Sequence, residues 1–216
     1  MPAAEASLRS RAWVLGLVVM ANWSGLRPLS KAHAHALVFL ANSLAPIYED
    51  TGLEARVIKH EHGPFYPDAQ WDLDRLVGQG LLNVSGVTLS DTCGRWWMDG
   101  SYEASASGKA AFNECRNLPL LSRSYRFLLE LTNAFASLRQ DARNRAALVD
   151  VIYATPNRAN RTALVFEEAE QNFSSLTAVA FDDLAGPDIV LTPKERLQLY
   201  FGYLEDNTQS SGSHAS

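Results

Sequence analysis

Two pairs of histidines are the residues whose type and spacing most suggest chemistry. His33 and His35 lie two apart on a predicted helix, where side chains at that spacing point in different directions, so they do not share one metal ion. His60 and His62 end a predicted strand, where alternate residues share a face. Zinc needs three or four ligands, however, and the sequence signals no third one. We therefore expect no metal site and treat these residues as ordinary polar surface histidines.

Motifs of the common enzyme classes are missing from the sequence. It contains no Walker A loop, no Gly-x-Gly-x-x-Gly and no Gly-x-Ser-x-Gly. Neither Asp nor Glu stands two positions before any of the four lysines, so the Asp/Glu-x-Lys core of a common nuclease site is also missing. The two cysteines, Cys93 and Cys115, are too few for a disulfide scaffold and predict reduced thiols in the cytoplasm. We expect a non-enzyme without a cofactor or a small-molecule substrate.

The first half of the chain predicts helices and short strands in a recognisable order. The apolar run of residues 12–21 follows two arginines like a short leader, but it is about half the ~20 residues that span a bilayer. A buried first helix explains it better, and we expect no membrane contact. The predicted helices cover residues 5–23, 31–48 and 67–78, and the predicted strands cover 55–60, 81–84 and 95–103, with a tight turn at 99–100.

The order helix, helix, strand, helix and two-stranded wing is that of a winged helix-turn-helix domain, which we assign to residues 1–115. Apolar spacing then predicts further helices at 121–138, 144–153 and 193–204. The fold class expected is mainly α with a small β-wing. Residues 116–204 form a helical extension in this prediction, and the polar residues 205–216 form a disordered tail.

Charge is segregated along the 216 residues, although the total is only −5. Residues 1–115 carry a net charge of −3, residues 116–161 carry +5 and residues 162–216 carry −7. The basic middle is a candidate contact with a partner or a nucleic acid, unless its arginines pair with the acidic C-terminal segment of the same fold. The candidates are Arg123, Arg126, Arg139, Arg143, Arg145, Arg158 and Arg161.

The predicted third helix, which reads DNA in many winged-helix proteins, has the wrong charge for that task. Its expected outer face carries Asp68, Asp72 and Asp74 against one arginine, Arg75, and carboxylates repel phosphate. Gln70 and Trp71 also fall on this face. Trp71 lies opposite the apolar stripe, so it is an exposed indole suited to a protein interface unless the second half of the chain covers it. We interpret this helix as a protein-contact helix.

Two stretches carry a resemblance to a known family. They are Leu37 to Tyr48 (LVFLANSLAPIY) and His62-Gly-Pro-Phe-Tyr-Pro, the latter followed by residues 72–82 (DLDRLVGQGLL). Together they resemble the winged-helix "middle components" of bacterial ABC-type three-component systems, some of them antiphage systems of the Lamassu type. The resemblance covers about residues 5–115 and extends more distantly to winged-helix antitoxin-like proteins. It implies an accessory subunit that joins an SMC/Rad50-like ATPase to an effector, often a nuclease, in a complex that contacts DNA; it implies no catalytic residue.

The sequence thus leaves two main functional hypotheses. The first is a non-catalytic bridging subunit of an SMC-like defence complex. The alternative is a winged-helix DNA-binding regulator or antitoxin, which would bind duplex DNA in a salt-sensitive way through the arginines of residues 116–161. An enzyme with an unrecognised site is the third hypothesis, for which the sequence offers no candidate residue.

Overall fold

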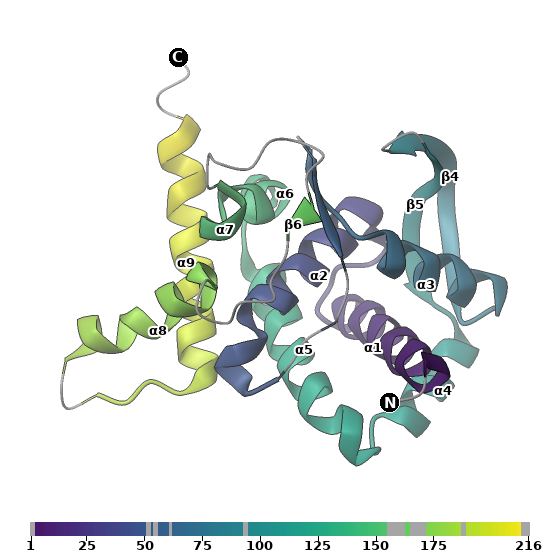
Figure 1. The fold of residues 1–216 in the computed structure, drawn as a ribbon, viewed down its shortest axis with the longest axis horizontal. Coiled ribbons are helices and arrows are strands. Elements are labelled where there is room, and N and C mark those ends of the chain that lie inside the picture. The colour runs from purple at the N-terminus through teal and green to yellow at the C-terminus, as the bar shows by residue number, and fades with distance from the viewer. Residues whose placement is uncertain are drawn as a thin grey trace.

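Helices make up most of the described structure, and two small antiparallel sheets complete it (Figure 1). The computed structural model describes residues 3–50, 53, 56–60, 62–92, 95–154, 163–164, 172–186 and 189–212. The helices are α1 (Ala3–Trp23), α2 (Lys31–Leu44), α3 (Pro67–Gly78), α4 (Ala106–Cys115), α5 (Pro119–Ser137), α6 (Gln140–Val149), α7 (Val151–Ala154), α8 (Phe173–Ala185) and α9 (Pro193–Gly212), with a 3-10 turn η1 (Ala45–Tyr48). The strands are β1 (Leu29–Ser30), β2 (Val57–His60), β3 (Gly63–Phe65), β4 (Leu82–Thr92), β5 (Arg95–Ala104) and β6 (Ala163–Leu164).

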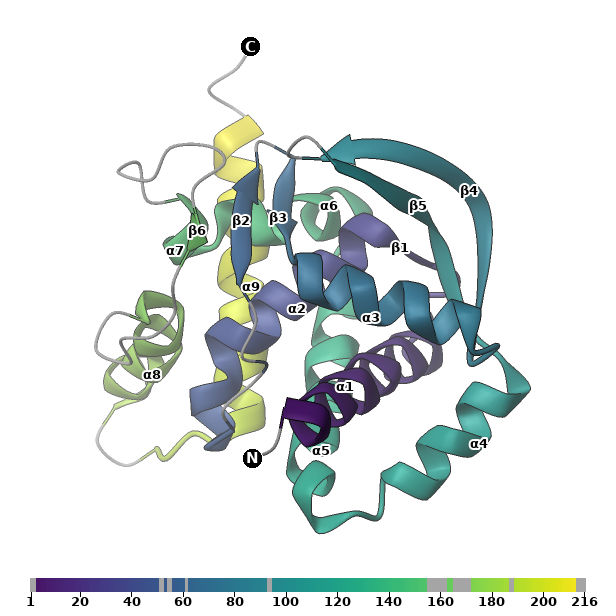
Figure 2. The same ribbon diagram turned by 45° about the vertical axis from the view of Figure 1, so that its right-hand side comes forward.

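Helix α1 lies at the centre of the core, which confirms the prediction of a buried first helix. Trp13 and Val18 are fully buried, and α3, α4 and α5 all pack against α1 (Figure 2). Within the part of the chain that the structure describes, no helix is both long and apolar enough to cross a membrane. The apolar run that resembles a leader is therefore core.

Helix α2 begins where the local signals predict, but it ends earlier than the predicted residue 48. The Ser30 hydroxyl accepts a hydrogen bond from the His33 amide at 3.2 Å, which caps the first turn. Residues 31–48 are all helical, but the α-helix gives way to η1 after Leu44, where Pro46 lacks the N–H that an α-helix would use. A second sheet of order β3-β2-β6 follows, of which only β2 was predicted.

The first sheet has the order β1-β5-β4, and its long hairpin corrects the predicted turn at residues 99–100. Both residues lie inside β5, with Asp99 opposite Thr88. The register shifts between Ser85 and Thr88, where Gly86 has a φ of 62°. A Cβ on Gly100 would lie 3.0 Å from the Ser85 carbonyl oxygen. Glycine is needed here because a bulged partner strand comes close, not because the chain reverses.

Helix α4 packs so closely on the chain before β4 that it requires a glycine. A Cβ on Gly108 would lie 2.0 Å from the Leu81 carbonyl oxygen, a backbone atom that cannot move aside alone. We expect Gly108→Ala to lower the free energy of unfolding by about 1–3 kcal/mol, as overpacking does. Urea denaturation followed by circular dichroism measures this change. Gly78→Ala, at a helical glycine with nothing within 4 Å, is the matched control and should be neutral or slightly stabilising.

Helix α5, the first helix of the predicted extension, packs directly on α1. The Tyr125 hydroxyl donates a hydrogen bond to the Ala12 carbonyl oxygen at 2.9 Å, and the Tyr125 ring lies over Gly16. The domain boundary after residue 115 stays a prediction, and the two parts share a continuous hydrophobic core.

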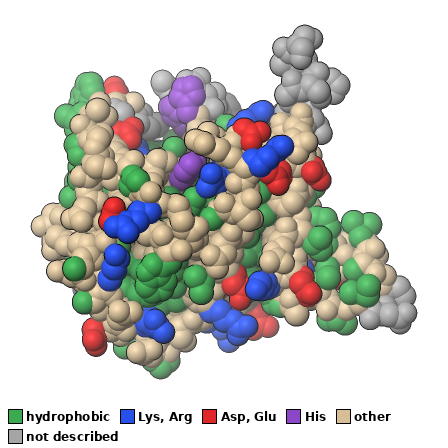
Figure 3. Space-filling view, turned by 180° about the vertical axis from the view of Figure 1, so that it is seen from behind, with side chains coloured by type: hydrophobic (Ala, Val, Ile, Leu, Met, Phe, Trp, Pro, Cys, Tyr) green, Lys and Arg blue, Asp and Glu red, His purple; other side chains and the backbone are tan. Residues whose placement is uncertain are grey.

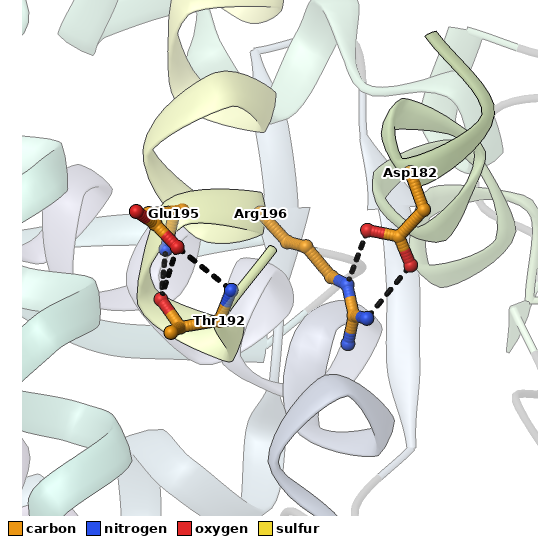
Figure 4. Close-up of polar contacts among 4 residues, drawn as sticks. All are labelled: Asp182, Thr192, Glu195 and Arg196. Atoms are coloured by element: carbon orange, nitrogen blue, oxygen red, sulfur yellow. Dashed lines mark hydrogen bonds and ion pairs between the residues drawn. The ribbon is translucent and has the colours of Figure 1, made fainter. Parts of the chain in front are cut away.

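Two polar motifs lie at the start of α9, and the second of them joins this helix to α8 (Figure 4). The Thr192 amide and hydroxyl both donate to the Glu195 carboxylate, at 2.8 and 2.7 Å, and the Glu195 amide donates back to the Thr192 hydroxyl. This is a capping box, which confirms the predicted start of the last helix. Arg196 then makes a bidentate ion pair with Asp182 of α8, with N–O distances of 3.0 and 2.7 Å.

The last helix is longer than predicted, which corrects the expected disordered tail over residues 205–212. Helix α9 continues to Gly212, and Thr208 is buried against α6. The Glu205 carboxylate accepts one hydrogen bond from the Arg139 backbone amide at 3.1 Å and forms an ion pair with the Arg139 guanidinium. The polar composition of these residues predicted a disordered tail. Their stabilising contacts come from α6, which is distant in the sequence, so composition alone did not reveal them. Residues 213–216 lie outside the described residues.

Candidate protein-contact surface

The outer face of α3 is a narrow stripe made of Asp68, Trp71 and Arg75. Pro67 starts the helix and Asp68 lies in its first turn, where a negative charge favours the helix dipole. On the opposite side Leu73 is buried in the core. The spacing of three and four residues keeps the three stripe residues on one face, and all are exposed.

Trp71 is exposed and held in place, which answers the question that the sequence left open. Its side chain is 52% exposed, and nothing in the described C-terminal half buries it. The ring packs edge-on against Trp97 of β5 at 6.1 Å between centroids, and Trp97 in turn packs on Phe65. The Arg75 guanidinium lies 5.9 Å from the Trp71 ring centre on the same stripe. An exposed indole with a fixed orientation is typical of a binding anchor.

The β4–β5 hairpin presents a second apolar area, which we name the hairpin patch and define as Val87, Leu89 and Trp96. Their side chains are 53%, 68% and 71% exposed. Leu89 pairs with Met98 and Asp91 pairs with Trp96, so Leu89 and Trp96 share a face of the hairpin. Exposed apolar side chains grouped on one element indicate a contact surface more strongly than scattered ones.

Asp72 is not a surface residue, which corrects its predicted place on the outer face. It is 4% exposed and accepts a hydrogen bond from the Ser10 hydroxyl at 2.6 Å. Arg11 of α1 and Arg75 lie 3.5 and 3.6 Å from its carboxylate. The cause is α1, which passes against this side of α3 and supplies polar partners. The expected row of three exposed carboxylates therefore loses Asp72.

Gln70 is also wrongly placed by the sequence pattern, because it is fully buried at the centre of a polar network. Its amide nitrogen donates to Asp74 at 2.8 Å, to the Tyr102 hydroxyl at 2.9 Å and to the Met98 carbonyl at 3.3 Å. Asp74 is consequently half-buried rather than free on the surface. Burial raises the pKa of Asp74, while the hydrogen bond from Gln70 and the charge of Lys31 act in the opposite direction.

His35 completes this network and is not the surface histidine that we expected. The Tyr66 backbone N–H donates to its Nδ1 at 3.2 Å, so Nε2 carries the proton and donates to the Gln70 Oε1 at 3.0 Å. Burial lowers the pKa of His35 to about 4, which keeps the ring neutral at ordinary pH. The network links α2, α3 and β5 and so holds the Trp71 stripe next to the hairpin.

The charge around this surface disfavours nucleic acid. Residues 67–104, which cover α3 and the hairpin, contain six acidic and two basic residues, a net charge of −4. Binding to DNA depends on cations that neutralise phosphates. This surface therefore suits a protein partner better than a DNA groove.

The candidate arginines of residues 116–161 are dispersed by the structure, and most of the described ones have internal partners. Arg123 lies 3.4 Å from the Glu49 carboxylate, Arg126 lies 3.7 Å from Glu130, and Arg139 lies 3.2 Å from Glu205. Basic side chains on the face in Figure 3 alternate with acidic ones rather than forming one field. Of the remaining four candidates, Arg145 donates a long hydrogen bond to the Thr208 carbonyl, and Arg143 lines a cleft beside α2. Arg158 and Arg161 lie outside the described residues.

The described residues offer surfaces and polar networks, and among them no group of three or more His, Cys, Asp or Glu side chains could hold a metal ion. The buried network around Gln70 was missed because its partners are 35 and 32 residues away in the chain.

Comparison with known proteins identifies no relative: no family model matches the chain, and no curated protein or solved structure matches it significantly.

Proposed function

We propose that this chain is a non-catalytic subunit that binds a protein partner through the α3 stripe and the hairpin patch. The observation that carries the proposal is Trp71, an exposed indole held by Trp97 and Arg75 on an acidic surface. A few residues supply most of the binding energy in protein interfaces, and Trp, Tyr and Arg are enriched among them, whereas the net charge of −4 opposes phosphate.

The fold that we propose for residues 1–115 is a winged helix. Strand β1 precedes α2 and pairs with β5, and the β4–β5 hairpin follows α3, as the wing follows the third helix in that fold. An additional η1, β2 and β3 lie between α2 and α3. In such an arrangement the third helix and the wing form the contact surface, which here carries the stripe and the patch.

The proposed partner is an SMC/Rad50-like ATPase of a bacterial antiphage system of the Lamassu type, with an effector such as a nuclease on a second surface. The family resemblance of residues 37–48, 62–67 and 72–82 supports this class of partner. The proposal places the protein in the cytoplasm and makes any DNA contact indirect, through the complex.

Co-expression with the products of the adjacent genes tests the proposal. We expect an SMC-like ATPase to co-purify, and we expect Trp71→Ala and Trp96→Ala each to weaken its binding at least tenfold by biolayer interferometry. Trp23→Ala is the matched control. Trp23 is 50% exposed, close to the 52% of Trp71, but it packs on Phe112 of α4 and lies outside the proposed surface.

Three results would contradict the proposal. One is a protein that ignores the products of its neighbouring genes. Another is an ATPase complex that is weakened equally by Trp23→Ala and Trp71→Ala. A salt-sensitive shift of duplex DNA that Arg123→Ala or Arg145→Ala abolishes, without any protein partner, would favour the regulator hypothesis instead.

A further inference from the structure

A small polar cleft lies between α2, α6 and β3, on a part of the molecule that the proposed function does not use. Its volume is about 170 Å³, room for about five water molecules at ~30 Å³ each. The cleft is bordered by Ser30 of β1 and His33 of α2, by His62 and Gly63 at the start of β3, and by Arg143 of α6. On the face in Figure 3, histidine side chains lie near a basic side chain.

Arg143 is the unusual member of this cleft. Its Nε atom is buried without a hydrogen-bond acceptor, and its guanidinium has no carboxylate partner among the described residues. Arg139, one turn earlier, has two carboxylates nearby, Asp141 and Glu205. A partly buried cation without an acceptor is costly, and a bound anion would remove that cost.

The other polar groups in the cleft are donors or can become donors. His33 Nε2 lies 2.9 Å from the Asn144 Oδ1, and the Asn144 amide nitrogen has no hydrogen-bond acceptor among the described residues. Burial lowers the pKa of His33, the hydrogen bond that His33 donates to Asn144 opposes this, and the charge of Arg143 lowers the pKa further. A bound anion would counteract the Arg143 charge and so favour the protonated form of His33.

The backbone around the cleft also contributes positive charge. Ser30 caps the N-terminus of α2, whose dipole places partial positive charge at the cleft. No carboxylate occurs among the described residues that line the cleft. Three separate elements therefore converge with donors and positive charge on a space of one small anion.

We propose that this cleft binds a phosphate group, with Arg143, His33 and Asn144 as its ligands. The phosphate is that of a small phosphomonoester or inorganic phosphate, or a phosphodiester of a nucleic acid backbone. The site does not depend on the proposed partner or on the α3 stripe.

Titration of the full-length ¹⁵N-labelled protein with inorganic phosphate tests the site at constant ionic strength. We expect the histidine side-chain signal that His33→Gln removes to shift with a millimolar Kd. Arg143→Gln should weaken binding at least tenfold, and Asn144→Ala should weaken it severalfold. Arg116→Gln removes the same charge at an exposed position after α4, and it should change the Kd less than twofold.

Two further probes distinguish the source of the phosphate. If dAMP binds as phosphate does and the dinucleotide dTpdT does not, the ligand is a monoester; binding of dTpdT with the same loss in Arg143→Gln indicates a nucleic acid backbone. The absence of any shift at 50 mM phosphate would overturn the proposal. Equal weakening by Arg143→Gln and Arg116→Gln would also overturn it, because the effect would then be general electrostatics. Thermal unfolding of each variant verifies that it is folded.

Discussion

Replacement of Asp150 by alanine is expected to lower the free energy of unfolding by about 3–5 kcal/mol. Asp150 is fully buried between α6 and α7, where its carboxylate accepts hydrogen bonds from the Tyr200 hydroxyl at 2.6 Å, the Ser174 hydroxyl at 2.8 Å and the Ile152 amide at 2.9 Å. Alanine would leave these buried donors without an acceptor. Urea denaturation at pH 7 measures the loss.

Two further variants separate this network from a general effect of charge. Asp150→Asn retains the shape and one acceptor oxygen, so it should lose less than the alanine variant. Asp141→Ala removes an exposed carboxylate from the same part of the chain and should change stability by less than 0.5 kcal/mol, the usual range for surface substitutions. An equal loss in Asp141→Ala and Asp150→Ala would contradict the assigned role.

Acid is expected to destabilise the fold through His35. Its pKa is about 4 in the folded protein, because of burial, against an ordinary value of about 6.5 in the unfolded chain. Between these two pH values the unfolded chain binds a proton that the folded chain does not bind. Stability therefore falls as the pH decreases from 6.5 to 4 and levels off below, with a total loss from this group of about 3 kcal/mol.

Comparison with His35→Gln isolates this contribution from that of other acid-sensitive groups. Glutamine can still bond Gln70 but does not titrate, so its stability should decline less than that of the wild type between pH 6.5 and 4.5. In the wild-type protein the His35 ring signals should keep the neutral form down to about pH 4 in NMR spectra. Parallel stability profiles of the two proteins would contradict the prediction.

The parts of the fold that the sequence predicted are those governed by local signals. Ser30 marks the start of α2, Pro67 starts α3, and the Thr192 capping box starts α9. Each signal acts within about one turn of the chain, so it survives whatever packs around it. Helix α8 escaped prediction, because its buried face carries Ser174 and Ser175 while the apolar Leu176 is exposed.

The candidate surface was predictable only in part, and the limit was the neighbours of α3. Helical spacing identified Asp68, Trp71 and Arg75 as one exposed face. The same spacing put Asp72 and Gln70 at the surface, but α1 covers the first and the network of His35 and Tyr102 encloses the second.

The sequence by itself therefore determined where the helices begin, their apolar faces and the acidic character of the third helix. Periodicity tells which residues are apolar, but it cannot tell whether a polar residue finds a buried partner. Only the tertiary structure decided that Asp72, Gln70 and Asp150 are interior, that most of the described candidate arginines pair internally, and that Trp71 stays exposed. The physical reason is that a buried polar group is stable only with hydrogen-bond partners, and for Asp72 and Asp150 these include residues 62 and 50 positions away along the chain.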